Sequence, residues 1–285
     1  MAANYQHELV GVFGQPVAEN PTGVMQEAGF AAAGLNWRYL NFEVAPEKLG
    51  DAMKALHTFG MRGINLTIPH KVAVIDYLDE LSPEAKTIGA VNTVRIENGK
   101  LIGENTDGKG FVRGMRQDSG IDPAGKRVVM LGAGGAARAV ATELILAGVS
   151  DLLVVNRSTD RGEKMVGDLK ASTAGPIRFQ AWQGTFEVPE SADLFVNCTS
   201  IGLFPDVNAM PNVDLSRAQP NMLVVDAVFN PPQTKLLTAA KERGLPTLDG
   251  LSMLVYQGVI AFQMWTGQDP DEAAMKRALR EALGV

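Results

Sequence analysis

The feature that most constrains the fold is a glycine-rich turn between a buried strand and a helix. The apolar run at 128–131 predicts the strand, and the alanine-rich run at 139–146, which lacks proline, predicts the helix. Gly132 allows a tight turn, Gly134 has no Cβ to keep a pyrophosphate away, and Ala137 is small enough for close helix–strand packing. The helix amides and dipole would then attract phosphates. The alternative is an ordinary strand–helix turn that binds nothing.

The overall composition is that of a globular protein with room for one large or two modest domains in its 285 residues. The net charge of -6, with no Lys/Arg-rich run, argues against a nucleic-acid partner. No signal peptide and no apolar stretch long enough to cross a bilayer is visible, so no membrane partner is expected.

The cysteine and histidine content excludes two kinds of site. Cys198 is the one cysteine, so no internal disulfide can form, which suits a cytoplasmic location. We expect it to be a buried strand-end residue and not a nucleophile. With three histidines and one cysteine, no metal-ligand spacing appears, and we expect no metal.

Strand and helix patterns alternate along the chain, which predicts an α/β fold. Asn98-Gly99 predicts a hairpin turn, and a further break at 119–125 suggests a domain boundary. Asp107 is expected to cap a helix that begins at Gly108. Strands are expected at 8–13, 37–44, 63–68, 128–131, 151–155, 193–197 and 222–226, and further helices at 24–33, 46–59, 139–146, 159–170, 232–243, 249–265 and 270–283.

The residues after the second strand of the nucleotide-binding unit indicate which dinucleotide binds. An acid there accepts from the adenosine ribose and selects NAD, whereas arginine pairs with the 2′-phosphate of NADP. Arg157 and Arg161 stand there, without an acid at the strand end, and Asn156 and Ser158 can assist. A guanidinium binds a phosphate through two hydrogen bonds, so NADP is the expected cofactor. The alternative is an ordinary basic pair on a solvated helix start.

A hydride transfer to or from a hydroxyl needs a group that moves the hydroxyl proton. A lysine beside a carboxylate can do this, and Lys71 and Asp107 each follow the end of a predicted strand. The alternative for Lys71 is a surface lysine at a helix start, and the alternative for Asp107 is a helix cap. Spacing alone does not bring the two side chains together.

Seven motifs, in this order, resemble the shikimate dehydrogenase family over nearly the whole chain. They are NLTIPHK at 65–71, AVNT at 90–93, NTDG at 105–108, GAGGA at 132–136, NRS at 156–158, NCTS at 197–200 and DGLSMLVYQ at 249–257. The resemblance implies NADP-dependent interconversion of 3-dehydroshikimate and shikimate, a step towards chorismate and aromatic amino acids. It also implies a substrate domain at 1–110 and 250–285, to which the C-terminal helices return, and a Rossmann-type NADP-binding domain at 111–249.

The resemblance also implies the roles of individual residues. Lys71 is the implied general acid/base, and Asp107 is its partner at the same hydroxyl. Thr67, Asn92 and Gln257 are the implied ligands of the substrate hydroxyls. The implied NADP-binding residues are Gly132, Ala133, Gly134, Gly135, Ala136, Asn156, Arg157, Ser158 and Arg161, with Thr199, Ala227 and Gly250 near the nicotinamide half.

Three positions depart from the family pattern. Asn20 and Thr22 stand where the family has two serines that hold the substrate carboxylate, and Phe229 replaces a tyrosine-type contact to it. A buried hydrogen bond to a charged group contributes ~1.5–3 kcal/mol, so one lost donor would weaken binding about tenfold or more. We therefore expect a divergent member with altered carboxylate recognition.

Other functions remain open on the sequence alone. A dehydrogenase of the same family acting on quinate or an aminoshikimate is one, and a catalytically silent NADP-binding sensor is another. A methylene-tetrahydrofolate-type dehydrogenase shares the two-domain plan but not the seven motifs. The expected partner is a small-molecule substrate, and the protein is expected to be a monomer or a homodimer.

Overall fold

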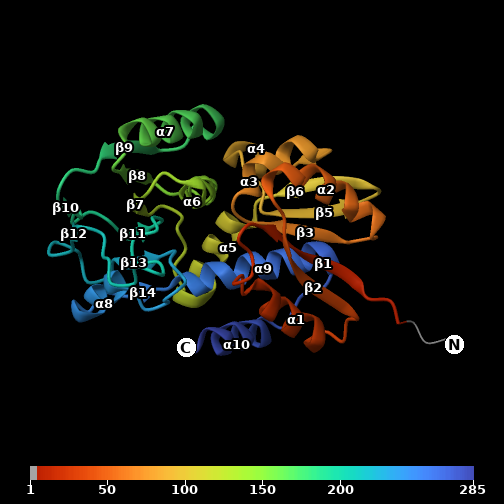
Figure 1. Ribbon diagram of the computed structural model, residues 1–285. Coiled ribbons are helices and arrows are strands. Elements are labelled where there is room, and N and C mark those ends of the chain that lie inside the picture. The colour runs from red at the N-terminus through yellow and green to blue at the C-terminus, as the bar shows by residue number, and fades with distance from the viewer. Residues whose placement is uncertain (1–4) are drawn as a thin grey trace. The chain divides into compact units, whose positions relative to one another are not determined.

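The computed structural model describes residues 5–285, which form two compact α/β units (Figure 1). The first unit contains the described residues up to Thr106 and resumes with Gln257–Val285. The second unit is Asp107–Tyr256. The chain passes between the units inside two helices, α5 (Thr106–Gly114) and α9 (Gly250–Thr266). The α/β fold expected from the sequence is confirmed.

The first unit is built on a mixed six-stranded sheet. Its strand order is β2-β1-β3-β5-β6-β4, with β1 parallel to β2 and β3, and β5 antiparallel to β3 and β6. The hairpin expected at Asn98-Gly99 is confirmed, and both residues have the positive φ that a two-residue turn requires. The strands are β1 (Glu8–Gly14), β2 (Trp37–Glu43), β3 (Gly63–Leu66), β4 (Glu80–Leu81), β5 (Thr93–Glu97) and β6 (Lys100–Glu104).

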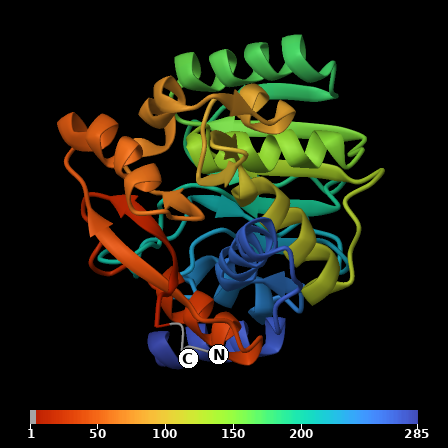
Figure 2. The same ribbon diagram turned by 90° about the vertical axis from the view of Figure 1, so that its right-hand side faces the viewer.

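Helices cover both faces of this sheet. Leu49, Met53 and Leu56 of α2 pack against one face, as their helical spacing predicts. On the other face Phe30 of α1 stacks on Phe262 of α9 with ring centroids 5.2 Å apart, and α10 lies beside α1 (Figures 1 and 2). The C-terminal helices therefore belong to the core of this unit. Its helices are α1 (Thr22–Ala32), α2 (Leu49–Thr58), α3 (His70–Ala73), α4 (Pro83–Ile88) and α10 (Glu272–Leu283), with short turns at Pro46–Lys48 and Val74–Tyr77.

The second unit is built on a parallel six-stranded sheet. The spatial order β9-β8-β7-β11-β13-β14 is the 3-2-1-4-5-6 order of a doubly wound dinucleotide-binding fold. The strands are β7 (Arg127–Leu131), β8 (Asp151–Asn156), β9 (Ile177–Ala181), β11 (Leu194–Asn197), β13 (Leu223–Asp226) and β14 (Thr247–Leu248), beside a separate pair, β10 (Phe186–Glu187) and β12 (Val213–Asp214).

Alternate side chains of these strands enter two separate cores. Val128 and Met130 face α5, α6 and α7, whereas Val129 and Leu131 face α8. The helices are α6 (Gly135–Leu146), α7 (Thr159–Thr173) and α8 (Lys235–Glu242), and α5 continues as a π-helical turn at Met115–Ser119. Among the helices of residues 5–285, none is both long and apolar enough to span a membrane.

Several helix starts differ from the sequence-based expectation, and for three of them the structure shows a local reason. Helix α6 begins at Gly135 and not at residue 139, because Gly135 and the three residues after it form its first turn. Helix α5 begins at Thr106, so Asp107 lies inside its first turn and is not its cap. Helix α8 begins at Lys235 because the hydroxyl of Thr234 caps it, which leaves Pro232 outside the helix.

Candidate active site

The glycine turn combines one glycine that the fold requires with one that it does not. Gly132 has φ +110°, and a Cβ there would lie 2.8 Å from the carbonyl oxygen of Cys198. Gly134 has φ −90°, and no described atom outside its own turn lies within 4 Å of where its Cβ would be. Neither packing nor backbone conformation therefore requires glycine at 134. The open space fits the close approach of a pyrophosphate to the first amides of α6.

The end of β8 presents two exposed arginines, Arg157 and Arg161, at the start of α7. The neighbouring polar side chains are engaged within the turn itself. The Ser158 hydroxyl accepts from the Arg161 N–H at 3.4 Å and caps α7, and the Asn156 amide donates to the Ser158 carbonyl at 2.8 Å. Asn156 and Ser158 thus shape the turn, and the two guanidiniums supply positive charge beside a helix N-terminus, a favourable place for a phosphate.

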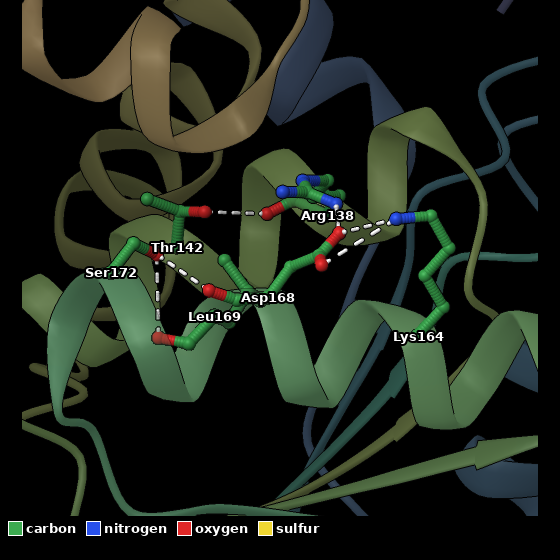
Figure 3. A network of polar contacts seen from close by, with 6 residues as sticks. All are labelled: Arg138, Thr142, Lys164, Asp168, Leu169 and Ser172. Carbon is green, nitrogen blue, oxygen red and sulfur yellow. Dashed lines mark hydrogen bonds and ion pairs between the residues drawn. The ribbon is translucent and has the colours of Figure 1, made fainter.

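A polar network links this helix to the helix of the glycine turn (Figure 3). Arg138 of α6 donates to the carboxylate of Asp168 on α7 at 2.8 Å, and Lys164 reaches the same oxygen at 3.1 Å. The hydrogen bond from Arg138, followed by that from Lys164, holds the pKa of Asp168 below its ordinary value. The sequence does not reveal this link, because Arg138 and Asp168 are separated by 30 positions and no motif joins them.

Cofactor residues predicted from separate motifs lie together at the carboxyl ends of the parallel strands. The Cβ position of Gly132 is 3.4 Å from the methyl group of Thr199. The Cβ position of Gly250 is 2.7 Å from the carbonyl oxygen of Ala227, so only glycine fits there.

Cys198 is buried at the end of β11, as expected, and burial, followed by the charge of Asp226, raises the pKa of its thiol. A protonated thiol is a poor nucleophile.

Three segments of the first unit meet where β1 and β3 end. The backbone N–H of Thr67 donates to the carbonyl of Phe13 at 3.0 Å. The N–H of Leu66 donates to the carbonyl of Asn92 at 2.8 Å, and that of Val91 to the carbonyl of Lys71 at 2.7 Å. These bonds bring the predicted residues Thr67, Lys71 and Asn92 to one edge of the sheet.

The loop before α1 lies at the same edge, because Gln15 of this loop donates to the carbonyl of Ile68 at 2.9 Å. Within the loop, the side-chain oxygen of Asn20 accepts from the N–H of Thr22 at 3.0 Å, and Thr22 is buried. Helix α1 is tied in turn to α9, because Gln26 donates to the carbonyl of Gly258 at 2.8 Å. Gln257, the residue before Gly258, is therefore held beside α1.

The predicted substrate and proton-transfer residues are divided between the two units. Asp107 and Phe229 belong to the second unit. The first unit contains Asn20, Thr22, Thr67, Lys71, Asn92 and Gln257. Within residues 5–285, no three His, Cys, Asp or Glu side chains are grouped as metal ligands.

The strand order, the glycine turn and the arginines define the second unit as a Rossmann-type dinucleotide-binding domain. Its attachment to an α/β unit that carries Lys71 places the chain in the class of two-domain, dinucleotide-dependent oxidoreductases. Three sequence families match in succession: the shikimate dehydrogenase substrate binding domain over 12–94, shikimate / quinate 5-dehydrogenase over 116–233, and the shikimate 5′-dehydrogenase C-terminal domain over 250–280. The chain belongs to the shikimate dehydrogenase family, as the seven motifs indicate.

Individual relatives match over almost their whole length. The shikimate dehydrogenase (NADP+) of Moorella thermoacetica is 45% identical over 279 residues, which cover 97% of this chain and 94% of the relative. The ligand-free 5-ketofructose reductase of Gluconobacter sp. strain CHM43 is 46% identical, with a TM-score of 0.93 and coverage of 98% and 99%. The shikimate 5-dehydrogenase of Thermus thermophilus, in complex with NADP(H) and shikimate, is 36% identical, with a TM-score of 0.84 and coverage of 96% and 99%.

Proposed function

We propose that this chain is an NADP-dependent dehydrogenase that interconverts 3-dehydroshikimate and shikimate, or a close analogue. The observation that carries the proposal is family membership along nearly the entire chain, with relatives named as NADP-dependent shikimate dehydrogenases. The binding partner is then a small cyclohexene carboxylic acid. The single cysteine favours a cytoplasmic location.

The cofactor assignment rests on the chemistry of the second unit. The open space at Gly134 admits the pyrophosphate, and Arg157 and Arg161 pair with the 2′-phosphate. When bound, NADP supplies the hydride for reduction and accepts it in the reverse direction. Gly132, Ala133, Gly135 and Ala136 would hold the pyrophosphate, while Thr199, Ala227 and Gly250 would hold the nicotinamide half.

Lys71 and Asp107 are the residues that act on the proton of the reacting hydroxyl. In the reduction, the Lys71 ammonium donates a proton to the carbonyl oxygen as that oxygen becomes a hydroxyl, and in the oxidation the neutral amine takes it back. The Asp107 carboxylate accepts a hydrogen bond from the same hydroxyl. Asp107 lies in the first turn of α5.

The remaining hydroxyl groups are recognised from the first unit. Thr67, Asn92 and Gln257 provide short polar side chains, and the meeting of β1, β3 and the residue before β5 supports their action at one site. Each hydrogen bond to a substrate hydroxyl discriminates against analogues that lack this group, because the buried partner is then left unsatisfied.

A second candidate function is the reduction of a neutral ketosugar. The similarity to 5-ketofructose reductase at 46% identity favours it, and so do Asn20, Thr22 and Phe229 in place of the family's carboxylate ligands. Glu19 adds an acid next to Asn20, which disfavours an anionic substrate at that position. An uncharged polyhydroxy ketone would meet no such repulsion.

The two candidates are separated by a substrate panel. Initial rates are measured with shikimate, quinate, aminoshikimate and 5-ketofructose, each with the NADP and NAD couples. The proposal expects the highest kcat/KM with shikimate or a cyclohexene analogue. A higher value with 5-ketofructose would select the ketosugar reductase, and no turnover of any compound would favour an NADP-binding sensor.

The role of Lys71 is tested with a matched pair of lysine variants. Lys71→Met removes the proton donor, and we expect kcat to fall by about a hundredfold or more. Lys54→Met removes an exposed lysine on α2, and we expect kcat to stay unchanged. Equal rates in the two variants would refute the role of Lys71.

A further inference from the structure

A fully buried carboxylate, Asp226, ends strand β13 of the second unit. Three groups donate hydrogen bonds to it: the side-chain amide of Asn197 at 2.9 Å, the backbone N–H of Val228 at 3.0 Å and the hydroxyl of Thr234 at 2.7 Å. Burial outweighs these bonds and raises the pKa of Asp226 to about 6. An apolar side chain would fill such a position at less cost in free energy. The hydrogen bonds that the carboxylate accepts are therefore the reason for its presence.

The Asn197 side chain extends this network to a second loop. Its oxygen accepts from the backbone N–H of Thr199 at 3.1 Å and from the Thr199 hydroxyl at 2.7 Å. The Thr199 hydroxyl accepts in turn from the N–H of Ile201 at 3.2 Å. The loops that follow β11 and β13 are therefore joined through one buried side-chain pair, Asn197 and Asp226.

The position of these loops in the sheet indicates what they hold. Strand β7, with the glycine turn, is central; β8, with Arg157, lies on one side of it, and β11 and β13 lie on the other. A dinucleotide bound at such a switch point places its adenosine half over the side of β8 and its other half over the side of β11 and β13. The loops joined by Asp226 are thus on the side of the nicotinamide.

A third segment depends on the same loop. The Cβ position of Gly250, the first residue of α9, is 2.4 Å from the carbonyl oxygen of Val228. A shift of the backbone at Val228 towards Gly250 would therefore clash with the first residue of α9. Because the N–H of Val228 donates to Asp226, the carboxylate also fixes this contact.

We propose that Asp226 is a positioning residue that holds the Thr199 loop and the Ala227–Phe229 loop, through Asn197 and Val228, against the nicotinamide half of NADP. The inference rests on the proposed NADP site, but it concerns a residue that touches neither the glycine turn nor the arginines. It distinguishes the two halves of the cofactor, because the segments that the carboxylate holds, including the Thr234 cap of α8, all follow β11 or β13 on the nicotinamide side.

The test compares a whole cofactor with one of its halves. NADPH binding is measured by nicotinamide fluorescence, and binding of adenosine 2′,5′-bisphosphate, which lacks the nicotinamide half, by calorimetry. Asp226→Asn is expected to weaken NADPH about tenfold, as for a hydrogen bond to a charged group, and to leave the bisphosphate affinity within about twofold. In turnover, kcat falls more than the KM for NADP rises.

Asp193→Asn is the matched control in the same sheet. Asp193 precedes β11 at its opposite end, where its carboxylate pairs with Arg127 at 3.1 Å. This variant is expected to bind both ligands like the wild type. If Asp226→Asn does not fold, Thr234→Val removes one of the three donors to Asp226 and is expected to show the same selective loss, reduced in size.

The possible results distinguish the positioning role of Asp226 from the proposed dehydrogenase function. Equal weakening of both ligands by Asp226→Asn, or of neither, would overturn the positioning role while leaving the proposed function in place. A wild-type chain that binds both ligands but turns over no substrate would contradict the proposed function, and a selective loss of NADPH binding in Asp226→Asn would still support the positioning role. A wild-type chain that binds neither ligand would overturn both.

Discussion

The side chain of Asn92 accepts a hydrogen bond from the backbone N–H of Thr106 at 2.7 Å and so satisfies the first amide of helix α5. The Asn92 amide also donates to the Thr106 hydroxyl at 2.9 Å. Thr106 is fully buried and is followed by Asp107. A residue implied in substrate binding therefore also fixes the start of the helix that carries the proposed proton-transfer carboxylate.

These two roles of Asn92 can be separated by substitution. Asn92→Ala removes both, and we expect the free energy of unfolding to fall by about 1–3 kcal/mol, because the buried groups of Thr106 lose their partner. Asn92→Asp keeps an acceptor for the Thr106 N–H and loses the amide donor. We expect its free energy of unfolding to lie between those of the wild type and Asn92→Ala, because burial of the carboxylate offsets part of the retained bond, and kcat/KM to fall about tenfold or more. Urea unfolding and steady-state kinetics measure the two effects, and full activity in Asn92→Asp would exclude a donor role.

Gly132 and Gly134 provide a matched pair within the glycine turn. Gly134→Ala places a methyl group in open space at φ −90°, so we expect an unchanged Tm. The same methyl group obstructs the pyrophosphate, so the KM should rise by a similar factor for NADP and NAD. Gly132→Ala instead strains a residue at φ +110° against the carbonyl of Cys198, and its Tm should fall.

Thermal unfolding and cofactor kinetics on both variants check this prediction. A Tm of Gly134→Ala well below that of the wild type would show that the fold, and not a ligand, requires this glycine. Unchanged KM values for both cofactors in the same variant would contradict the placement of the pyrophosphate.

Arg157 should determine the choice between the two cofactors. Arg157→Ala removes a charged hydrogen bond to the 2′-phosphate, worth about 1.5–3 kcal/mol, so the KM for NADP should rise between about tenfold and a hundredfold. The KM for NAD, which lacks this phosphate, should change little. Arg217→Ala, at an exposed position elsewhere in the second unit, is the control. Equal effects of Arg157→Ala on both cofactors would refute the phosphate contact.

The raised pKa of Asp226 predicts that the free energy of unfolding falls as the pH rises. Burial raises this pKa to about 6 in the folded protein, whereas the unfolded chain has its ordinary value near 4. The contribution of the protonated carboxyl is therefore fully present below pH ~4 and is lost as the pH rises through ~6, by about 1.4 kcal/mol per unit in between. From pH 5 to pH 7.5 the wild type should lose about 1.4 kcal/mol that Asp226→Asn does not lose.

Urea unfolding of both proteins at the two pH values measures this difference. Parallel changes in the wild type and Asp226→Asn would mean that the carboxyl titrates normally. Asp168 should act in the opposite direction, because its pKa is lowered by its bonds to Arg138 and Lys164. Its contribution is present at neutral pH and is lost only in acid, below its ordinary value, so it does not interfere between pH 5 and pH 7.5.

The sequence pattern correctly predicted those helices, strands and turns that depend on residues close together in the chain. The Asn98-Gly99 hairpin, the buried strand before Gly132 and the apolar face of α2 each depend on residues close together in the chain, and each is confirmed. The start of α5 was misplaced because its first amide is satisfied by Asn92, which lies 14 positions earlier. The short edge strand β14 has only two residues and no pattern that distinguishes it from a loop.

The site was predictable in its parts and not in its connections. Motifs identified residues such as Thr67, Arg157 and Thr199 as candidates, and their roles remain proposals. The bond between Asn197 and Asp226 joins positions 29 apart and follows from the strand order, which the sequence pattern does not specify. The link from Arg138 to Asp168 depends in the same way on how α6 and α7 pack.

The most direct test of the central claim is the initial rate of NADP reduction by wild-type protein with shikimate, followed by the absorbance of the reduced nicotinamide and compared with 5-ketofructose reduction by NADPH. We predict turnover of shikimate or a close cyclohexene analogue with NADP, at a higher kcat/KM than for the ketosugar and than with NAD. Turnover of 5-ketofructose with no measurable oxidation of any cyclohexene acid would contradict the claim.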